Sequence, residues 1–588
     1  MDTSQVVRLI SHRDKYIRRI LQSAFSIAAL CFLYLASTNY SSTTARLTAG
    51  IAIILASILT LVLWEHRAIL KRYRLTVFPP GYGSLRPRQQ DGAGRFLSLS
   101  ELATHFRWRP GSIFFGRPLK EHSFFGLFHN ISVGSPVDAK THMLTIASSG
   151  AGKGAACIIP NLLLYPGSVL VIDPKGENAH VTAARRGRPS TRVTSGRVKD
   201  HLGQDVHIFD PDFIVRRPEN CCWNPLSELN LSSPDLPTRV KEICEYLIVT
   251  PPDAGQNQFF YSAARNLLSA IILHTLSIEP PDRHNLIYIR RLILQGDTEL
   301  YDLLQDQLPT DDGEDNADNW RPDPHIHECH DPFTALLCFM ASNEARGGYV
   351  RGIAQKILSY DPEARTGVVM FLEEQTAFLD HYGLQQTLIR SDFSLRDLKT
   401  KDTTIYICIK PTSLSGLLRP VISLLVNMAV LAMQDEPAKP SHPVLFVLDE
   451  FYSLGRSKTI ETAMGLMRGY HLAIWPILQH IGQLKEHYPN TFDSFWRNCR
   501  AVQIFGDFEP DTLKAIEQRI GSTVVKTRGQ EIRKPLLTTD EMSSGFFEYS
   551  ARQQLVLMHQ QPAALLELVD YYKLFPADWY EEVPKAQA

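Results

Sequence analysis

The chain has 588 residues, too many for one hydrophobic core, so two or three domains are expected. Its formal net charge of −1 excludes binding to nucleic acid through a general cationic excess, and any basic surface must be local. The nine cysteines show no paired Cys-x-x-Cys spacing and mostly lie inside apolar runs, which is typical of packed thiols in a reducing compartment.

Two uncharged segments near the start of the chain predict a pair of transmembrane helices. Residues 20–37 and 47–64 contain no charged side chain, and each is long enough to cross the ~30 Å hydrocarbon core of a bilayer. Basic residues flank the pair on both outer sides and only Arg46 lies between, so both ends are expected in the cytoplasm. A cleaved signal peptide and a soluble apolar hairpin are the alternatives, but no small-residue cleavage site follows the first segment.

Residues 147–154 predict a phosphate-binding loop. They read Ala-Ser-Ser-Gly-Ala-Gly-Lys-Gly, directly after an apolar run and directly before a helix-like one. Small residues let backbone N–H groups close around phosphate oxygens at a helix start, and Lys153 would reach the β- and γ-phosphates. The expected nucleotide-binding residues are Ser149, Gly150, Ala151, Gly152, Lys153, Gly154 and Ala155.

This loop departs from the G-x-x-x-x-G-K-[ST] pattern at two positions. Ala147 stands in place of the first Gly, and Gly154 stands where a Ser or Thr would bind Mg²⁺. A glycine-rich turn from a strand to a helix, without a ligand, is therefore the alternative interpretation.

Apolar runs rich in Val, Ile and Leu predict a parallel sheet covered on both faces, and hence an α/β fold. The runs occupy residues 143–146, 168–172, 206–209, 404–409, 444–448, 472–478 and 501–505.

The long gap in this series of strands predicts an inserted domain. Residues 232–398 are mostly helical in pattern, so an all-α domain is expected inside a nucleotide-binding domain formed by residues 141–231 and 399–588. Residues 1–75 would form the two-helix membrane anchor, and residues 76–140 a linker with small strands.

The apolar run 444–448 delivers two carboxylates at its C-terminal end. Asp449 is predicted to hold Mg²⁺, directly or through water, and Glu450 to orient or polarise the attacking water. A buried strand that ends at an acidic cap is the alternative.

Two other clusters carry weaker signals. The basic stretch 185–199 is either a solvated loop or a contact to a DNA phosphate backbone. No second cluster with metal-ligand spacing accompanies the His-rich segment, which favours a polar loop over a zinc site. That segment contains His325, His327, Cys329 and His330.

The order of these motifs resembles the type IV secretion coupling proteins, the TraG-like conjugation ATPases. The resemblance runs from the first apolar segment to Tyr571-Tyr572, and in that family a Gly after the loop lysine is common. Besides the loop ending in Gly-Lys-Gly, it rests on Asp-Pro-Lys-Gly-Glu at 173–177, Trp-Asn-Pro-Leu at 223–226, Ser-Leu-Arg-Asp-Leu at 394–398, Leu-Asp-Glu-Phe at 448–451, Leu-Gly at 454–455, and Gln479.

The resemblance implies a RecA-like P-loop NTPase motor with an inserted helical domain, anchored in the bacterial inner membrane and assembled as a homo-hexamer. ATP and Mg²⁺ are the implied cofactors, and hydrolysis would drive single-stranded DNA with its bound relaxase towards the channel subunits of the secretion system. Arg468 matches an arginine finger that reaches a neighbouring subunit, and Gln479 matches a γ-phosphate sensor. A structural arginine in a subunit contact and a strand-end glutamine cap are the alternatives for these two residues.

Two other functions remain open. A coupling ATPase for protein effectors alone would carry the same motor residues. A nucleotide-binding scaffold or receptor with little turnover would need neither Glu450, Arg468 nor Gln479, so their joint presence favours an enzyme.

Overall fold

The computed structural model describes residues 94–119, 131–137, 142–189, 196–215, 220–251, 253–305, 331–467, 469–527, 530–543 and 552–583. The predicted membrane helices, Arg468 and the segment 325–330 lie outside these ranges. Among the residues described, no helix combines the length and apolarity that crossing a membrane requires.

The chain divides into two compact units. One comprises Met1–Phe96 and Ile520–Leu537, and the other comprises Leu97–Arg519 and Thr538–Ala588. The described part of the first unit contains an antiparallel hairpin of β10 (Ser522–Thr527) and β11 (Gln530–Pro535).

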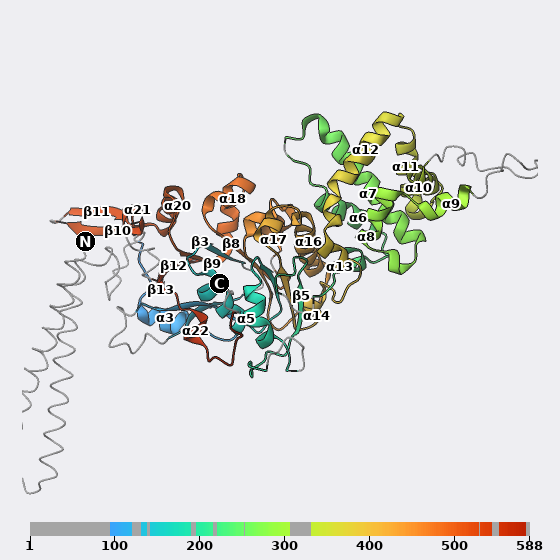
Figure 1. Cartoon of the computed structure of the whole chain (residues 1–588). Coiled ribbons are helices and arrows are strands. Elements are labelled where there is room, and N and C mark those ends of the chain that lie inside the picture. Colours follow the sequence, from blue (N-terminus) through green and yellow to red (C-terminus); the bar gives the residue numbers. More distant parts are fainter. Residues whose placement is uncertain are drawn as a thin grey trace, which may run out of the picture. The chain divides into compact units, whose positions relative to one another are not determined.

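The second unit is built on an eleven-stranded sheet with the order β2-β1-β13-β12-β9-β3-β8-β7-β4-β6-β5 (Figure 1). All strands from β9 to β5 run parallel, and β12, β13, β1 and β2 extend the sheet in antiparallel fashion. The strands are β1 (Ser112–Pro118), β2 (Val133–Pro136), β3 (His142–Ala147), β4 (Val169–Asp173), β5 (Asp205–Phe209), β6 (Thr403–Cys408), β7 (Val444–Leu448), β8 (Leu472–Leu478), β9 (Cys499–Phe505), β12 (Gln553–Met558) and β13 (Ala564–Glu567).

The parallel strands confirm the predicted α/β fold with a mostly parallel sheet, because every predicted apolar run forms one of them. β3 lies between β9 and β8, and β7 is the next strand beyond β8. Since parallel strands point the same way, the carboxyl ends of β3, β8, β7 and β4 meet at one edge of the sheet, where ligands bind in open α/β folds.

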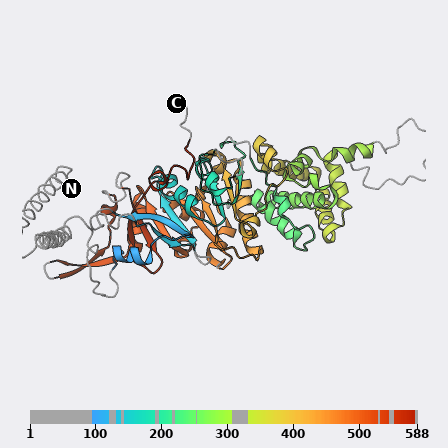
Figure 2. The ribbon, with the colours of Figure 1, turned by 90° about the horizontal axis from the view of Figure 1, so that it is seen from below.

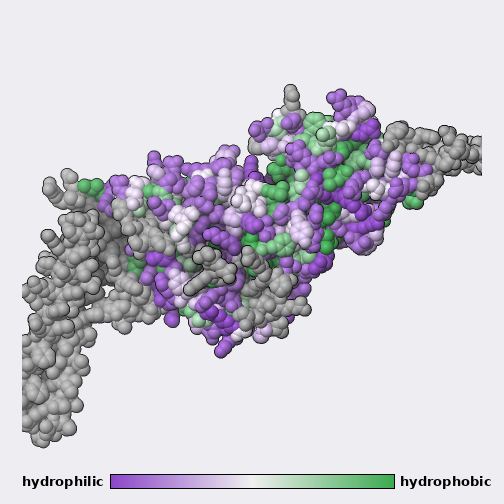
Figure 3. Space-filling model, in the orientation of Figure 1, coloured by the Kyte–Doolittle hydropathy of each residue, from purple (hydrophilic) through white to green (hydrophobic). Residues whose placement is uncertain are grey.

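Between β5 and β6 the described secondary structure consists of helices and connecting loops, apart from an isolated bridge at Asn220 (Figures 1 and 2, green to yellow). Figure 3 shows hydrophobic residues gathered over this helical segment, whereas hydrophilic residues cover most of the rest of that face. Its helices are α6 (Leu236–Leu247), α7 (Gln258–Ile278), α8 (Leu286–Gln295), α9 (Thr298–Gln305), α10 (Pro332–Ala341), α11 (Ala345–Leu358), α12 (Pro362–Gln375), α13 (Tyr382–Thr387) and α14 (Asp397–Thr400).

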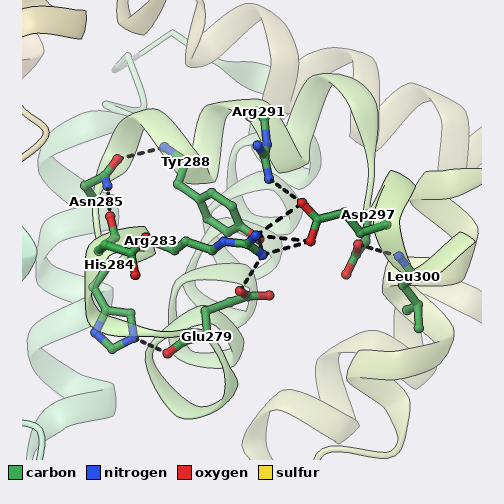
Figure 4. Close-up of polar contacts among 10 residues, drawn as sticks. Glu279, Arg283, His284, Asn285, Tyr288, Arg291, Asp297 and Leu300 are labelled. Carbon is green, nitrogen blue, oxygen red and sulfur yellow. Dashed lines mark hydrogen bonds and ion pairs between the residues drawn. The ribbon is translucent and has the colours of Figure 1, made fainter. Parts of the chain in front are cut away.

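A charged junction holds the ends of α7, α8 and α9 together (Figure 4). Arg283 donates to Glu279 at 3.0 Å and to Glu299 at 3.1 Å, and its guanidinium lies 5.3 Å from the centroid of the Tyr288 ring. Asn285 caps α8, because its side chain accepts from the backbone N–H of Tyr288 at 2.8 Å. These contacts fix the turn between α7 and α8.

Two arginines of the basic stretch 185–199 are buried, whereas Arg188 and Lys199 are exposed. Arg186, at the end of α5 (Glu177–Arg186), is fully buried and donates to the carbonyls of Leu162, Tyr165 and Gly167. The Arg186 guanidinium therefore donates hydrogen bonds to carbonyls at the C-terminal end of α4 (Ile159–Leu164), where the helix provides no N–H partner.

Arg185 is also buried, and it lies 3.6 Å from the centroid of the Trp579 ring. It pairs with Asp200 at 3.0 Å. For Arg185 and Arg186, both the solvated loop and the DNA contact are thus wrong.

Candidate nucleotide-binding site

The predicted phosphate loop follows the fully buried strand β3. Gly150 and Gly152 have φ angles of 76° and 88°, a left-handed region that favours glycine. The backbone N–H of Ala151 donates to the carbonyl of Ser148 at 3.3 Å, and the Ser148 hydroxyl accepts from the N–H of Asp507 at 2.9 Å. The loop is therefore closed on itself and tied to the residues that follow β9.

A helix begins directly after the loop. Lys153 precedes a single π-helical turn, Gly154–Ile158, which continues into α4. Such turns are frequent at functional sites, and the first N–H groups of a helix have no carbonyl partner within it. Ser149 and Gly150 are exposed and Ala155 is half-buried, so the loop surface is accessible to a ligand.

Three of the predicted catalytic and phosphate-contacting side chains meet at this loop. Lys153 Nζ lies 3.4 Å from Glu450 Oε1. Gln479 Nε2 donates to both carboxylate oxygens of Glu450, at 3.2 and 3.1 Å. The structure thus brings together residues from the ends of β3, β7 and β8.

Glu450 is held in an unusual backbone conformation. Its φ and ψ angles of 54° and 41° are left-handed, which is uncommon for a residue with a side chain. Such a conformation costs about 1–3 kcal/mol and persists only where the surrounding structure enforces it. Strained residues of this kind are found most often at functional sites.

Asp449 is half-buried beside Glu450. Burial raises its pKa to about 6, Lys153 opposes the rise, and Glu450 adds to it. Asp173, at the end of the neighbouring strand β4, is fully buried, and burial raises its pKa to about 7. A divalent cation would stabilise the ionised form of Asp449, so the donor set at this edge of the sheet fits Mg²⁺.

Arg468 lies outside the residues that the structure describes. Its chain position falls between α17 (Lys458–Leu466) and β8. Its predicted role as an arginine finger stays a prediction.

Sequence reasoning missed one arginine at the loop. Arg552 directly precedes β12. A Cβ atom on Gly152 would lie 2.9 Å from Arg552 Nη1, so the Arg552 guanidinium lies next to Gly152 of the phosphate loop. Asp570 forms an ion pair with Arg552 and also accepts from Lys573 Nζ at 3.0 Å. No motif in the sequence identifies Arg552, because the loop and this arginine are distant in the chain.

Sequence reasoning also missed a series of buried side-chain hydrogen bonds within the sheet. Trp475 Nε1 donates to Thr145 Oγ1 at 2.8 Å, and Thr145 Oγ1 donates to Gln503 Oε1 at 3.3 Å. Gln503 in turn donates to Gln554, which donates to the carbonyl of Phe115. These side chains connect β8, β3, β9, β12 and β1 through the interior of the sheet.

The chain resembles known proteins over most of its length. A family model described as "Type IV secretory system Conjugative DNA transfer" matches residues 112–561. Conjugal transfer protein TraG of Escherichia coli is 26% identical over 457 residues, which cover 72% of this chain and 63% of TraG. Protein VirD4 of Agrobacterium fabrum is 26% identical over 392 residues, which cover 66% of this chain and 50% of VirD4. The matches therefore span between half and two thirds of the length of these relatives.

The fold also matches solved structures. The bacterial conjugative coupling protein TrwBdeltaN70, in its unbound monoclinic form, superimposes with a TM-score of 0.56 at 16% identity, covering 84% of this chain and 99% of that chain. At this identity the likeness shows the fold alone. Because the family model matches most of the chain, the chain belongs to the type IV secretory system conjugative DNA transfer family.

Proposed function

We propose that this protein is an ATPase coupling protein of a type IV secretion or conjugation system. It would recruit single-stranded DNA bound to a relaxase and drive its transfer to the channel subunits. The observation that carries the ATPase part is the meeting of Lys153, Glu450 and Gln479 at a phosphate loop. Solved structures of TrwB in complex with ADPNP and in complex with ADP and Mg²⁺ support ATP and Mg²⁺ as cofactors.

Each residue has a proposed role at this site. The backbone of residues 149–155 binds the phosphates, and Lys153 exchanges Glu450 for a phosphate oxygen. Asp449 holds Mg²⁺, which neutralises charge on the phosphoryl oxygens when bound. Glu450, freed from Lys153, orients the attacking water, and Gln479 positions Glu450 through the two hydrogen bonds already present. Arg468 of a neighbouring subunit would complete the site.

The domain division and the assembly belong to the same proposal. The nucleotide-binding domain comprises residues 141–231 and 399–588, and residues 232–398 form the helical domain. Residues 1–75 anchor a homo-hexamer in the bacterial inner membrane with both anchor ends in the cytoplasm, and residues 76–140 link the anchor to the motor.

ATPase measurements on two variants test the proposal. We expect Lys153→Ala to lose nucleotide binding and hydrolysis, because the cation that neutralises the β- and γ-phosphates is removed. Glu450→Gln should still bind nucleotide but hydrolyse it at least 100-fold more slowly, since a neutral amide cannot activate water. Lys514→Ala and Glu363→Gln remove matching charges from the exposed surfaces of α20 (Pro510–Ile520) and α12, and should leave the rate unchanged.

The cargo is tested by measuring the ATPase rate with and without single-stranded DNA at several salt concentrations. A DNA-stimulated rate that falls as salt rises is expected, because phosphate contacts release counterions. A rate insensitive to DNA but stimulated by protein cargo would favour a transporter of protein effectors. Normal transfer in cells by both Lys153→Ala and Glu450→Gln would instead favour a scaffold.

A further inference from the structure

The phosphate loop lacks the side-chain oxygen that usually binds Mg²⁺ in loops of this type. Loops of this type place a Ser or Thr hydroxyl on Mg²⁺ directly after the lysine, whereas this chain has Gly154, which has no side chain. A Cβ atom on Gly154 would lie 4.0 Å from Glu177 Oε2, and no other described residue outside the immediate chain neighbourhood comes within that distance. The space left by the absent hydroxyl therefore faces a carboxylate.

The fold holds Glu177 in this place. β4 ends at Asp173, and Gly176 turns the chain with a φ angle of 71° so that α5 begins at Glu177. The Asp173 carboxylate accepts from the backbone N–H of Ala179 at 2.8 Å, which fixes the first turn of α5. Because β4 is the neighbour of β7, Glu177 starts its helix beside the strand that delivers Asp449.

The Glu177 carboxylate lies in the first turn of α5 and within electrostatic range of Tyr571. Its side chain is exposed, and it forms no hydrogen bond or ion pair with any residue that the structure describes. The aspartate next to it in the fold, Asp173, is by contrast fully buried and hydrogen-bonded.

We propose that Glu177 supplies, from helix α5, the oxygen that a Ser or Thr at position 154 would supply, and so binds the Mg²⁺ of the nucleotide complex directly or through a bound water. Carboxylates and waters are the ligands that Mg²⁺ prefers in proteins. This inference rests on the proposed function, because it assigns a residue to the same nucleotide site.

The exchange of a hydroxyl for a carboxylate has a consequence for nucleotide binding. In this role Glu177 adds a carboxylate to those of Asp449 and Glu450, so the site would repel the phosphates of a metal-free nucleotide and gain more from the cation. We therefore expect nucleotide affinity to depend strongly on Mg²⁺.

The test measures metal binding to the full-length chain in detergent. Mn²⁺ replaces Mg²⁺, its binding in the presence of ADP is followed by electron paramagnetic resonance, and ADP affinity is measured with and without the metal. Glu177→Gln should weaken Mn²⁺ binding about 10- to 100-fold, whereas metal-free ADP affinity should be unchanged or higher.

Rescue by a hydroxyl makes the test specific. Gly154 has no positive φ angle and a Cβ atom there meets only Glu177, so Gly154→Ser fits without rearrangement. The double variant Gly154→Ser/Glu177→Gln should recover most of the lost Mn²⁺ affinity. Glu363→Gln, which removes a glutamate from the first turn of α12, is the matched control and should bind Mn²⁺ as the wild type does.

The outcomes separate the two proposals. Mn²⁺ affinity that is unchanged in Glu177→Gln, or a loss that Gly154→Ser does not repair, would overturn the role of Glu177 while leaving nucleotide binding intact. A wild-type protein that binds no metal–nucleotide complex would instead overturn the proposed function.

Discussion

At the residue scale, Asp173 makes stability depend on pH. Its pKa is raised by burial from 3.8 to about 7, so the native state keeps this proton over a range in which the unfolded chain has lost it. Unfolding then releases a proton, and the free energy of unfolding falls as pH rises from about 4 to 7, by up to about 1.4 kcal/mol per pH unit.

Asp173→Asn should remove most of this dependence. The neutral amide keeps an acceptor for the N–H of Ala179, and the buried Oδ1 of Asn178, which has no partner among the described residues, could accept from it. Thermal unfolding followed at pH 5 to 8 should show the variant gaining stability over the wild type as pH rises. A parallel pH dependence in both proteins would contradict the assignment, and exposed Asp511→Asn serves as the control.

Some residues of the nucleotide-binding site could be predicted from the sequence and others could not. Lys153 and Glu450 were predictable because each lies a few residues after a strongly apolar strand and parallel strands end at a common edge, whereas Gln479 was identified through the family resemblance. Arg186 and Arg552 were not predictable, since an arginine in a polar stretch gives no sign of which distant carbonyl or loop it will meet.

At the element scale, the continuous apolar runs of β3 to β9 identified these strands, because both faces of a parallel sheet are buried. β12 and β13 were missed. β12 begins with Gln553 and Gln554, and although Gln554 is fully buried, its polar side chain interrupts the apolar pattern that marks a central strand. The order of the strands also depends on contacts between distant segments, which no local pattern contains.

Gln503 of β9 is the central link between these strands, because it joins the parallel strands to the antiparallel ones. Gln503→Leu should leave the side chains of Thr145, Cys157 and Gln554 without their buried partner, at about 1–3 kcal/mol for each unsatisfied group. We expect a clear fall in the unfolding midpoint in a thermal melt. Gln518→Leu, on the exposed face of α20, should change the midpoint little, and equal effects of both variants would contradict the argument.

At the scale of the whole molecule, the proposed hexamer predicts complementation between subunits. Lys153→Ala inactivates the phosphate loop of its own subunit, and Arg468→Ala removes the proposed finger that acts on a neighbour. An equal mixture of the two inactive proteins should regain activity, because roughly a quarter of the interfaces in a randomly mixed ring combine an intact loop with an intact arginine.

The control mixture pairs Lys153→Ala with Glu450→Gln. Both changes lie in the same nucleotide site, so no interface in the mixed ring is complete and the ATPase rate should stay at background. Recovery in this control, or none in the Arg468 mixture, would argue against a finger that acts between subunits.

The place of β3 within the sheet determines when during synthesis the phosphate loop can form. β3 ends at Ala147, but its two neighbours, β8 and β9, begin only at Leu472 and Cys499. While the ribosome is making the intervening residues, the loop strand has neither of its hydrogen-bonding neighbours. The apolar side chains of β3 therefore stay exposed until the last part of the chain has been made. Sheets that depend on such distant pairing fold slowly and expose aggregation-prone surface. A nascent chain that stalls before Phe505 should consequently be a substrate for chaperones rather than a nucleotide-binding fragment.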